Sequence, residues 1–190
     1  MTQRWIVIGL GNPGDQYANT RHNIGQMVIN HLAISNSVSK FSPHKSKVDI
    51  ADIKVGQAPI VLAKSRGFMN ESGIPTRALS DFYKVDPAHI IAIHDELDIE
   101  FNTIRLKLGG GDNGHNGLKS LTSHLGTPNY YRVRMGIGRP VGRQDPADFV
   151  LKPFASVERS LLEDFIARGA ESIESLIQFG LELTQQKFNK

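Results

Sequence analysis

The sequence predicts an α/β fold in which one domain contains a twisted mixed β-sheet covered by helices on both faces. Short continuous apolar runs, such as residues 5–10 and 89–94, are typical of strands buried on both faces of a sheet. Segments with apolar residues at helical spacing lie between these runs, and other segments alternate between apolar and polar residues. The 190 residues are enough for one sizeable core, and no linker or repeat divides them, so we expect a single domain over residues 1–190.

Each element follows from its own local pattern. Strands are expected at residues 5–10, 48–55, 59–63, 89–94, 104–108 and 131–137. Helices are expected at residues 23–34, 72–83 and 116–125 and, in two pieces, between residues 156 and 188. We expect Ser72 to cap the second helix, with Pro75 in its first turn, and Gly126 to end the third. Gly169 and Gly180 weaken a single long C-terminal helix, which predicts its division.

The composition limits the classes of partner and of site. Lys and Arg number 22 against 19 Asp and Glu, and the net charge of +3 permits an anionic partner without requiring one. The absence of cysteine excludes a disulfide framework, a zinc–thiolate site and a cysteine nucleophile. The N-terminal segment lacks a signal-peptide pattern, and no apolar stretch reaches the ~18 residues that a membrane span needs. We therefore expect a soluble, cytoplasmic protein.

The first motif is Gly-Leu-Gly-Asn-Pro-Gly at residues 9–14, which matches the glycine pattern of dinucleotide-binding loops. That function needs an acidic residue about 20 positions later, but none occurs between Asp15 and Asp49. Pro13 also removes a backbone N–H that would bind a pyrophosphate. The motif therefore indicates a tight turn, although a turn alone leaves its asparagine and the nearby His22 without a role.

The second motif is His-Asp-Glu-Leu-Asp at residues 94–98, where an apolar strand ends in ionisable residues. Ligands of open α/β sheets bind beyond the carboxyl ends of the strands, so these side chains are candidates for chemistry. A divalent metal bound by His94, Asp95 and Glu96 is one alternative, but adjacent strand residues point to opposite faces, so no more than about half can converge. The other alternative is that these residues form a solvated acidic strand end without a function.

The third motif is the glycine-rich segment 108–117, which opens a predicted helix. Such a loop can present N–H groups to an anion, but Leu118 separates Gly117 from Lys119, unlike the order in a Walker loop. Asp112 is the one acid between residues 105 and 143, whereas the basic residues there are Arg105, Lys107, Lys119, Arg132, Arg134, Arg139 and Arg143. This segment, with two tyrosines interleaved, predicts either a face that binds phosphates and bases or a solvated basic surface.

Taken together, the motifs resemble the bacterial peptidyl-tRNA hydrolases. No single segment is specific, but the matching segments follow the family's order over about residues 5–151. They are Gly9–Gly14, Tyr17, Thr20–Asn23, Phe68–Asn70, Ser72–Gly73, His94–Asp98, Gly114–Lys119 and Arg134–Pro140. The resemblance implies a monomeric α/β enzyme with this family's fold, which hydrolyses the ester between a peptide and the 3′-terminal ribose of tRNA without a metal or an organic cofactor.

The resemblance also implies roles for individual residues. His22 would take a proton from a water, and Asp95 would orient the imidazole and stabilise its charged form. Asn70 would lie nearest the water and the developing oxyanion. The remaining substrate contacts are expected from Asn12, Tyr17, Phe68, Met69, His115 and Asn116. Lys107 and Arg134 would bind the 5′-phosphate at the acceptor stem of the tRNA.

Two segments depart from the family's pattern. Ser65-Arg66-Gly67 precedes Phe68-Met69-Asn70 where family members usually carry a proline and a threonine, and this change could alter the backbone that presents Asn70. Asp112-Asn113 occupies part of the glycine-rich loop and places an acid beside the expected RNA surface.

Two other functions stay open. An RNA-binding module that has kept this fold predicts tRNA affinity that survives loss of His22, with no cleavage. A metal-dependent hydrolase that uses His94, Asp95 and Glu96 predicts inhibition by a chelator.

Overall fold

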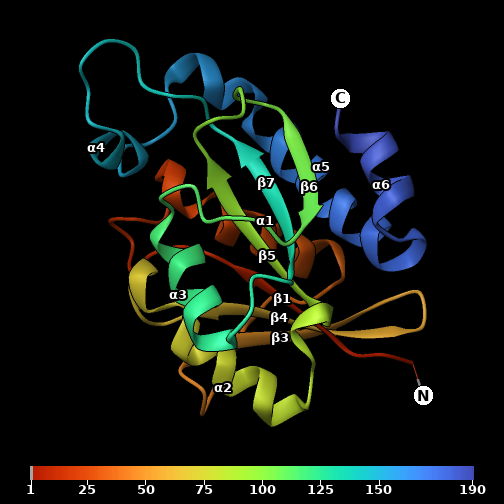
Figure 1. Cartoon of the computed structure of the whole chain (residues 1–190). Coiled ribbons are helices and arrows are strands. Elements are labelled where there is room, and N and C mark those ends of the chain that lie inside the picture. Colours follow the sequence, from red (N-terminus) through yellow and green to blue (C-terminus); the bar gives the residue numbers. More distant parts are fainter. Residues whose placement is uncertain (1) are drawn as a thin grey trace.

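The computed structural model describes residues 2–190, and in this range the chain forms a seven-stranded mixed sheet with the strand order β2-β3-β4-β1-β5-β7-β6 (Figure 1). Parallel pairing joins β1 to β4, β1 to β5 and β5 to β7, whereas the outer pairs are antiparallel. The strands are β1 Trp5–Gly9, β2 Ser42–His44, β3 Val48–Val55, β4 Ala58–Ser65, β5 Ile90–Glu96, β6 Ile104–Leu108 and β7 Tyr131–Gly136. The parallel centre brings the carboxyl ends of β1, β4, β5 and β7 to one edge of the sheet.

Helices cover both faces of this sheet. They are α1 Ile24–Ser35, α2 Gly73–Tyr83, α3 Asn116–Leu125, α4 Pro146–Val150, α5 Ser156–Phe179 and α6 Leu181–Phe188, and single 3₁₀ turns lie at η1 Arg21–Asn23, η2 Met69–Glu71 and η3 Pro87–His89. Helices α1 and α5 pack on one face, α2 and α3 lie together on the other, and α6 packs beside β6 (Figure 1).

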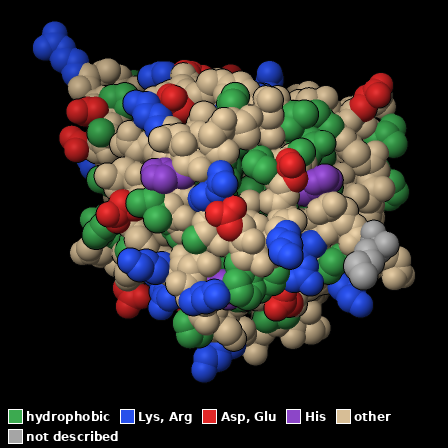
Figure 2. All heavy atoms as spheres, turned by 60° about the horizontal axis from the view of Figure 1, so that its bottom comes forward, with side chains coloured by type: hydrophobic (Ala, Val, Ile, Leu, Met, Phe, Trp, Pro, Cys, Tyr) green, Lys and Arg blue, Asp and Glu red, His purple; other side chains and the backbone are tan. Residues whose placement is uncertain are grey.

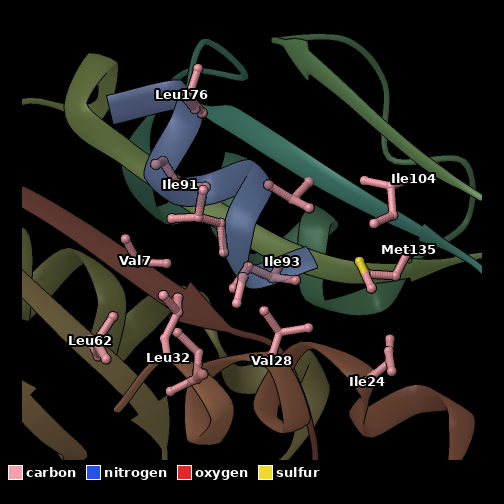
Figure 3. Close-up of a cluster of buried hydrophobic side chains, with 14 of the residues drawn as sticks. Val7, Ile24, Val28, Leu32, Leu62, Ile91, Ile93, Ile104, Met135 and Leu176 are labelled. Carbon is pink, nitrogen blue, oxygen red and sulfur yellow. The ribbon is translucent and has the colours of Figure 1, made fainter. Parts of the chain in front are cut away.

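Alternation along the central strands divides the core into two apolar clusters. Val7 on β1 and Ile93 on β5 face α1 and α5 in the larger cluster (Figure 3), whereas Ile6 and Ile90 face α2 and α3. All four side chains are fully buried, and burial of each contributes about 1.5–3 kcal/mol. The runs Trp5–Ile8 of β1 and Ile90–Ile93 of β5 are therefore apolar on both faces of the sheet, as the continuous runs in the sequence predicted.

The fold class predicted from the sequence is confirmed, and most elements begin and end within two residues of their predicted bounds. Two short elements were missed, β2 and α4. The division of the C-terminal helix occurs at Gly180 alone, and Gly169 lies inside α5, where its Cα packs closely against the end of the Met135 side chain. The predicted capping role of Ser72 is wrong, because its hydroxyl donates to the carbonyl of Met69 at 2.6 Å instead. In the part of the chain that the structure describes, no helix combines the length and apolar character of a membrane span.

Candidate active site

A cleft of about 430 Å³ lies where the loops after β1, β4 and β5 meet. Helix α3 and the short helix α4 complete its walls. The predicted site residues that line it are Asn12, His22, Phe68, Met69, Asn70, Asp95, His115 and Asn116. Tyr17 does not line the cleft itself, but its ring packs edge-on against Phe68 at a centroid distance of 6.3 Å.

His22 and Asp95 form a largely buried hydrogen-bonded pair in the cleft. His22 Nδ1 lies 3.0 and 2.9 Å from the two carboxylate oxygens of Asp95. His22 comes from η1, just before α1, and Asp95 comes from the next-to-last residue of β5, so the pair joins two segments 73 positions apart in the sequence. Both side chains are largely buried, with 13% and 3% of their surface exposed.

Burial and the contact with Asp95 have opposite effects on the pKa of His22. Burial by itself lowers the pKa of His22, but the charge and hydrogen bond of Asp95 outweigh it, so the pKa of His22 is raised above its ordinary value. Burial by itself would raise the pKa of Asp95, but the imidazole groups of His22 and His115 hold it well below its usual range. Asp95 is therefore an ionised acceptor throughout the physiological range.

His115 is the second histidine on the same carboxylate. Its Nε2 lies 2.9 Å from Asp95 Oδ1, and its ring lies 4.9 Å from that of His22 between centroids. Its Nδ1 accepts hydrogen bonds from backbone N–H groups in the first turn of α3, so His115 is the N-cap of that helix. The resemblance to the family gave His115 as a substrate contact, but did not show that its ring reaches Asp95.

The three predicted asparagines differ in how much of each amide is free. Asn12 Oδ1 accepts a hydrogen bond of 2.8 Å from the N–H of Met69, which leaves the amide N–H₂ of Asn12 for the cleft. The side chain of Asn23 in turn holds the backbone of Asn12 through two bonds of 2.9 Å. Asn70 and Asn116 line the cleft, and within residues 2–190 their side chains have no hydrogen-bonding partner. Their amides are thus free to bind substrate groups.

One wall of the cleft is apolar. Met69 is buried, whereas Phe68 is half exposed at the rim. Val150 and Leu151 form the opposite part from α4 and the residue that follows it, and sequence reasoning missed both. The available signal was Asp145-Pro146, because Asp145 caps α4 and Pro146 occupies its first position.

A second hollow, also about 430 Å³, lies beside the cleft and contains Lys107 and Arg134. Glu96 and Asn113 line both hollows and separate them. Burial and the neighbouring charge of Arg134 lower the pKa of Lys107, and burial lowers the pKa of Arg134. Lys107 on β6 and Arg134 on β7 project from the same face of two adjacent strands into a hollow that Glu96 and Asp98 also line.

Not every basic residue between residues 105 and 143 contributes to a basic surface, as the sequence suggested it would. Arg132 is fully buried, and its guanidinium donates to the carbonyls of Gly110, Gly111 and Pro128. The Arg132 side chain therefore fixes the backbone of the glycine-rich loop and contributes no charged group to the surface. On a different face, the one at the bottom of Figure 1 where α2 lies, basic and acidic side chains are intermixed (Figure 2).

The segment 112–113, which departs from the family's pattern, builds the loop that presents His115. Asp112 Oδ1 accepts from the N–H of Gly114 at 2.8 Å, and Asn113 has a left-handed backbone with φ of 48°. The amide of Asn113 donates to Glu96 Oε1 at 2.6 Å and to Asp98 Oδ2 at 2.5 Å. The loop is thereby tied to the end of β5.

The segment 65–67, the other departure, forms a tight connection to η2. Ser65 Oγ accepts from the N–H of Gly67 at 3.0 Å, and Arg66 Nη2 donates to the carbonyl of His44 at 2.9 Å. Glu71 Oε2 then accepts from the N–H of Phe68 at 3.3 Å. These bonds fix the backbone on either side of the turn that carries Asn70.

His22, Asp95 and His115 also place three ligand-type atoms within 4.8 Å of one another. However, both imidazoles use these atoms to bind the carboxylate, so a cation would have to replace those hydrogen bonds. Within residues 2–190, the set His94, Asp95 and Glu96 is not a convergent group of this kind. Adjacent residues of β5 point to opposite faces, and His94 Nδ1 donates to the backbone carbonyl of Asp95 at 2.8 Å.

Comparison with known proteins bears on what this cleft does. The family model described as peptidyl-tRNA hydrolase matches residues 6–190. The chain belongs to the peptidyl-tRNA hydrolase family. This confirms the family predicted from the sequence motifs, and with it the class of enzyme, a hydrolase.

Individual relatives support the assignment over nearly the whole chain. A peptidyl-tRNA hydrolase of Frankia alni is 52% identical over 185 residues, which cover 97% of this chain and 93% of that protein. One of Arthrobacter sp. strain FB24 is 48% identical over 191 residues, which cover 100% of this chain and 98% of that protein. The crystal structure of the peptidyl-tRNA hydrolase from Acinetobacter baumannii superimposes with a TM-score of 0.90 at 33% identity and covers 98% of this chain and 95% of that one.

Proposed function

We propose that this chain hydrolyses the ester between the carboxyl end of a peptide and the 3′-terminal ribose of tRNA, and that the nucleophile is a water activated by His22 and Asp95. The observation that supports this most directly is the buried hydrogen bond from His22 Nδ1 to the carboxylate of Asp95 in the cleft of a family member. No metal or organic cofactor takes part in the proposed reaction.

The hydrogen bond sets the state of the histidine. A carboxylate only accepts, so Nδ1 of His22 carries the proton and Nε2 of the neutral ring has a free lone pair. Nε2 takes a proton from water as the oxygen attacks the ester carbonyl, and Asp95 stabilises the imidazolium that forms. The tetrahedral intermediate then collapses, the C–O bond to the ribose breaks, and the imidazolium returns the proton to the leaving ribose oxygen.

The asparagines supply the remaining polar contacts. Asn70 has a free amide, and we assign it to the water and the oxyanion. Asn12 can only donate, because its oxygen is bound to Met69, so it suits a carbonyl of the substrate. Asn116 has both donors and its acceptor free for a peptide group. Met69, Phe68 and Tyr17 would contact the peptide side chains.

Lys107 and Arg134 suit the 5′-terminal phosphate of the acceptor stem. A point charge and a planar fork that line one hollow provide the strong hydrogen bonds a terminal phosphate requires. We further propose that the chain acts as a monomeric single domain on peptidyl-tRNA in the cytoplasm.

The test is release of free tRNA from an N-blocked aminoacyl-tRNA, measured with and without a chelator. The proposal predicts cleavage that the chelator does not change. Binding without cleavage would instead support an RNA-binding module, and loss of cleavage with the chelator would support a metal-dependent hydrolase.

A further inference from the structure

Both ring nitrogens of His115 have partners inside the protein. Nδ1 lies 3.1 Å from the N–H nitrogen of Gly117 and 3.4 Å from that of Leu118, at the start of α3. Nε2 lies 2.9 Å from Asp95 Oδ1, and only 8% of the side chain is exposed. The ring therefore lines the cleft but has no free nitrogen for a polar contact with the substrate.

These partners define where the ring proton lies. Backbone N–H groups only donate, so Nδ1 of His115 must offer its lone pair to Gly117 and Leu118. The ionised Asp95 only accepts, so Nε2 must carry the hydrogen. A second proton on Nδ1 would point at two N–H groups and at the positive end of the helix dipole. The helix thus selects a neutral ring with the hydrogen on Nε2.

His94 supports this ring from the opposite side. The two rings meet edge-on at a centroid distance of 5.1 Å, and His94 Nδ1 donates to the carbonyl of Asp95 at 2.8 Å. Burial lowers the pKa of His94 to about 3, so His94 stays uncharged beside His115. The ring of His115 is therefore packed as well as hydrogen-bonded.

We propose that His115 is a positioning residue for hydrolysis, in which α3 holds the imidazole so that its Nε2–H fixes the Asp95 carboxylate against His22. This inference rests on the proposed reaction and deepens it. His22 Nδ1 contacts both oxygens of the Asp95 carboxylate, and His115 Nε2 contacts Oδ1. Without His115 the carboxylate is free to rotate away from the geometry that orients His22. Turnover should fall, whereas substrate affinity should not.

Two variants separate this role from simple capping. In His115→Asn the shorter side chain can still accept from the N–H groups of α3, but it cannot extend to Asp95. His115→Ala loses both contacts. We expect both variants to lower kcat about tenfold with KM within about twofold, because each removes the same contact to Asp95. Only His115→Ala should also lower the melting temperature, by about 3 °C.

Other outcomes would overturn the proposal. Full turnover in His115→Asn would show that capping is the whole role. A rise in KM with unchanged kcat in both variants would show that His115 binds substrate.

A spectroscopic measurement tests the same inference without substrate. Nitrogen-15 NMR of the histidine-labelled protein should show that the neutral ring of His115 carries its hydrogen on Nε2 and not on Nδ1. The opposite tautomer would contradict the inference. If the protein cleaves no N-blocked aminoacyl-tRNA, the proposed function fails, but this measurement still decides how His115 contacts Asp95.

Discussion

At the residue scale, the site depends on one buried carboxylate that accepts from two imidazoles. The side chain of Asp95 is 3% exposed, and an uncompensated charge at that depth would be strongly destabilising. His22 and His115 compensate it from η1 and from α3. The same contacts leave only Nε2 of His22 available to accept a proton from water, since both nitrogens of His115 are occupied.

The raised pKa of His22 predicts the pH dependence of the reaction. A general base must be neutral, so kcat/KM should fall with decreasing pH, with a midpoint above the ordinary histidine value of 6.5. In Asp95→Asn the carboxylate is lost and burial remains, so that midpoint should shift downward, and turnover should fall by about 10³–10⁴ because the tautomer is no longer fixed. The pH–rate profiles of both proteins check this, and an identical acid limb in the variant would be evidence against His22 as the base.

Asn70 and Asn116 provide a matched pair for separating catalysis from binding. If Asn70 contacts the oxyanion, Asn70→Ala should lower kcat by about 10²-fold or more with little change in KM. Asn116→Ala should mainly raise KM, because its contacts are the same in the ground state and the transition state. Steady-state kinetics on an N-blocked aminoacyl-tRNA measure both. An Asn70→Ala enzyme that loses affinity alone would contradict the assignment.

The sequence predicted individual residues of the site better than their contacts. His22, Asp95 and Asn70 were assigned because they fall in motifs that resemble one family. The resemblance implied the contact between His22 and Asp95, although it spans 73 positions. It gave no contact between His115 and Asp95, which depends on how α3 is placed against β5. Arg132 was counted as a surface charge, since composition cannot distinguish an exposed guanidinium from one that binds three carbonyls.

At the element scale, the cleft depends on close packing between α2, η2 and α3. Gly73 at the start of α2 faces the carbonyl of Ser120 on α3, and an added Cβ would lie 2.0 Å from that oxygen. The N–H of Gly73 also donates to Ser120 Oγ at 2.8 Å. The turn that carries Asn70 and the helix that begins with Asn116 are therefore held at a fixed separation.

Gly73→Ala should disturb both stability and activity. We expect a loss of roughly 2–3 kcal/mol in unfolding free energy, because the two helices must move apart, and a lower kcat because Asn70 moves with them. Gly126→Ala at the other end of α3 is the control, since nothing lies within 4 Å of the added Cβ and only the left-handed backbone is strained, at about 1 kcal/mol. Denaturant unfolding and kinetics of the two variants check this, and equal effects would show that the helix contact does not matter.

Elements with strong local patterns were predictable, and those defined by tertiary contacts were not. Strand β5 is a continuous apolar run, and α3 ends at Gly126 with φ of 74°, as expected for a glycine stop. Strand β2 has three residues, one of them a proline, and exists because it pairs with β3. Helix α4 has five residues, too few for a periodic signal, yet it forms a wall of the cleft.

At the scale of the whole molecule, two hollows lie side by side and share one wall. The cleft contains the proposed base, and the adjacent hollow contains Lys107 and Arg134, with Glu96 and Asn113 between them. This arrangement suits a substrate whose ester and terminal phosphate are close in space. In the proposed function, it also separates the groups assigned to the chemistry from those assigned to tRNA binding.

Neutralising the basic hollow should therefore affect only substrates that contain tRNA. Lys107→Ala or Arg134→Ala should raise KM for N-blocked aminoacyl-tRNA about tenfold. Each should also reduce by about one the slope of log affinity against log salt concentration. Hydrolysis of a short N-blocked aminoacyl ester should be unchanged. Lys54→Ala on β3, toward the opposite edge of the sheet, is the control and should change neither substrate. Equal losses on both substrates would refute a phosphate-binding role.

Activation of the water by His22 is decided by single-turnover cleavage of N-blocked aminoacyl-tRNA by the intact protein and by His22→Ala, with tRNA affinity measured alongside. We expect His22→Ala to bind the substrate within about threefold of the intact protein but to cleave it about 10³-fold more slowly, because the imidazole that accepts the proton has been removed. If His22→Ala cleaves at the rate of the intact protein, the water is not activated by His22 and Asp95, and the proposed mechanism is wrong.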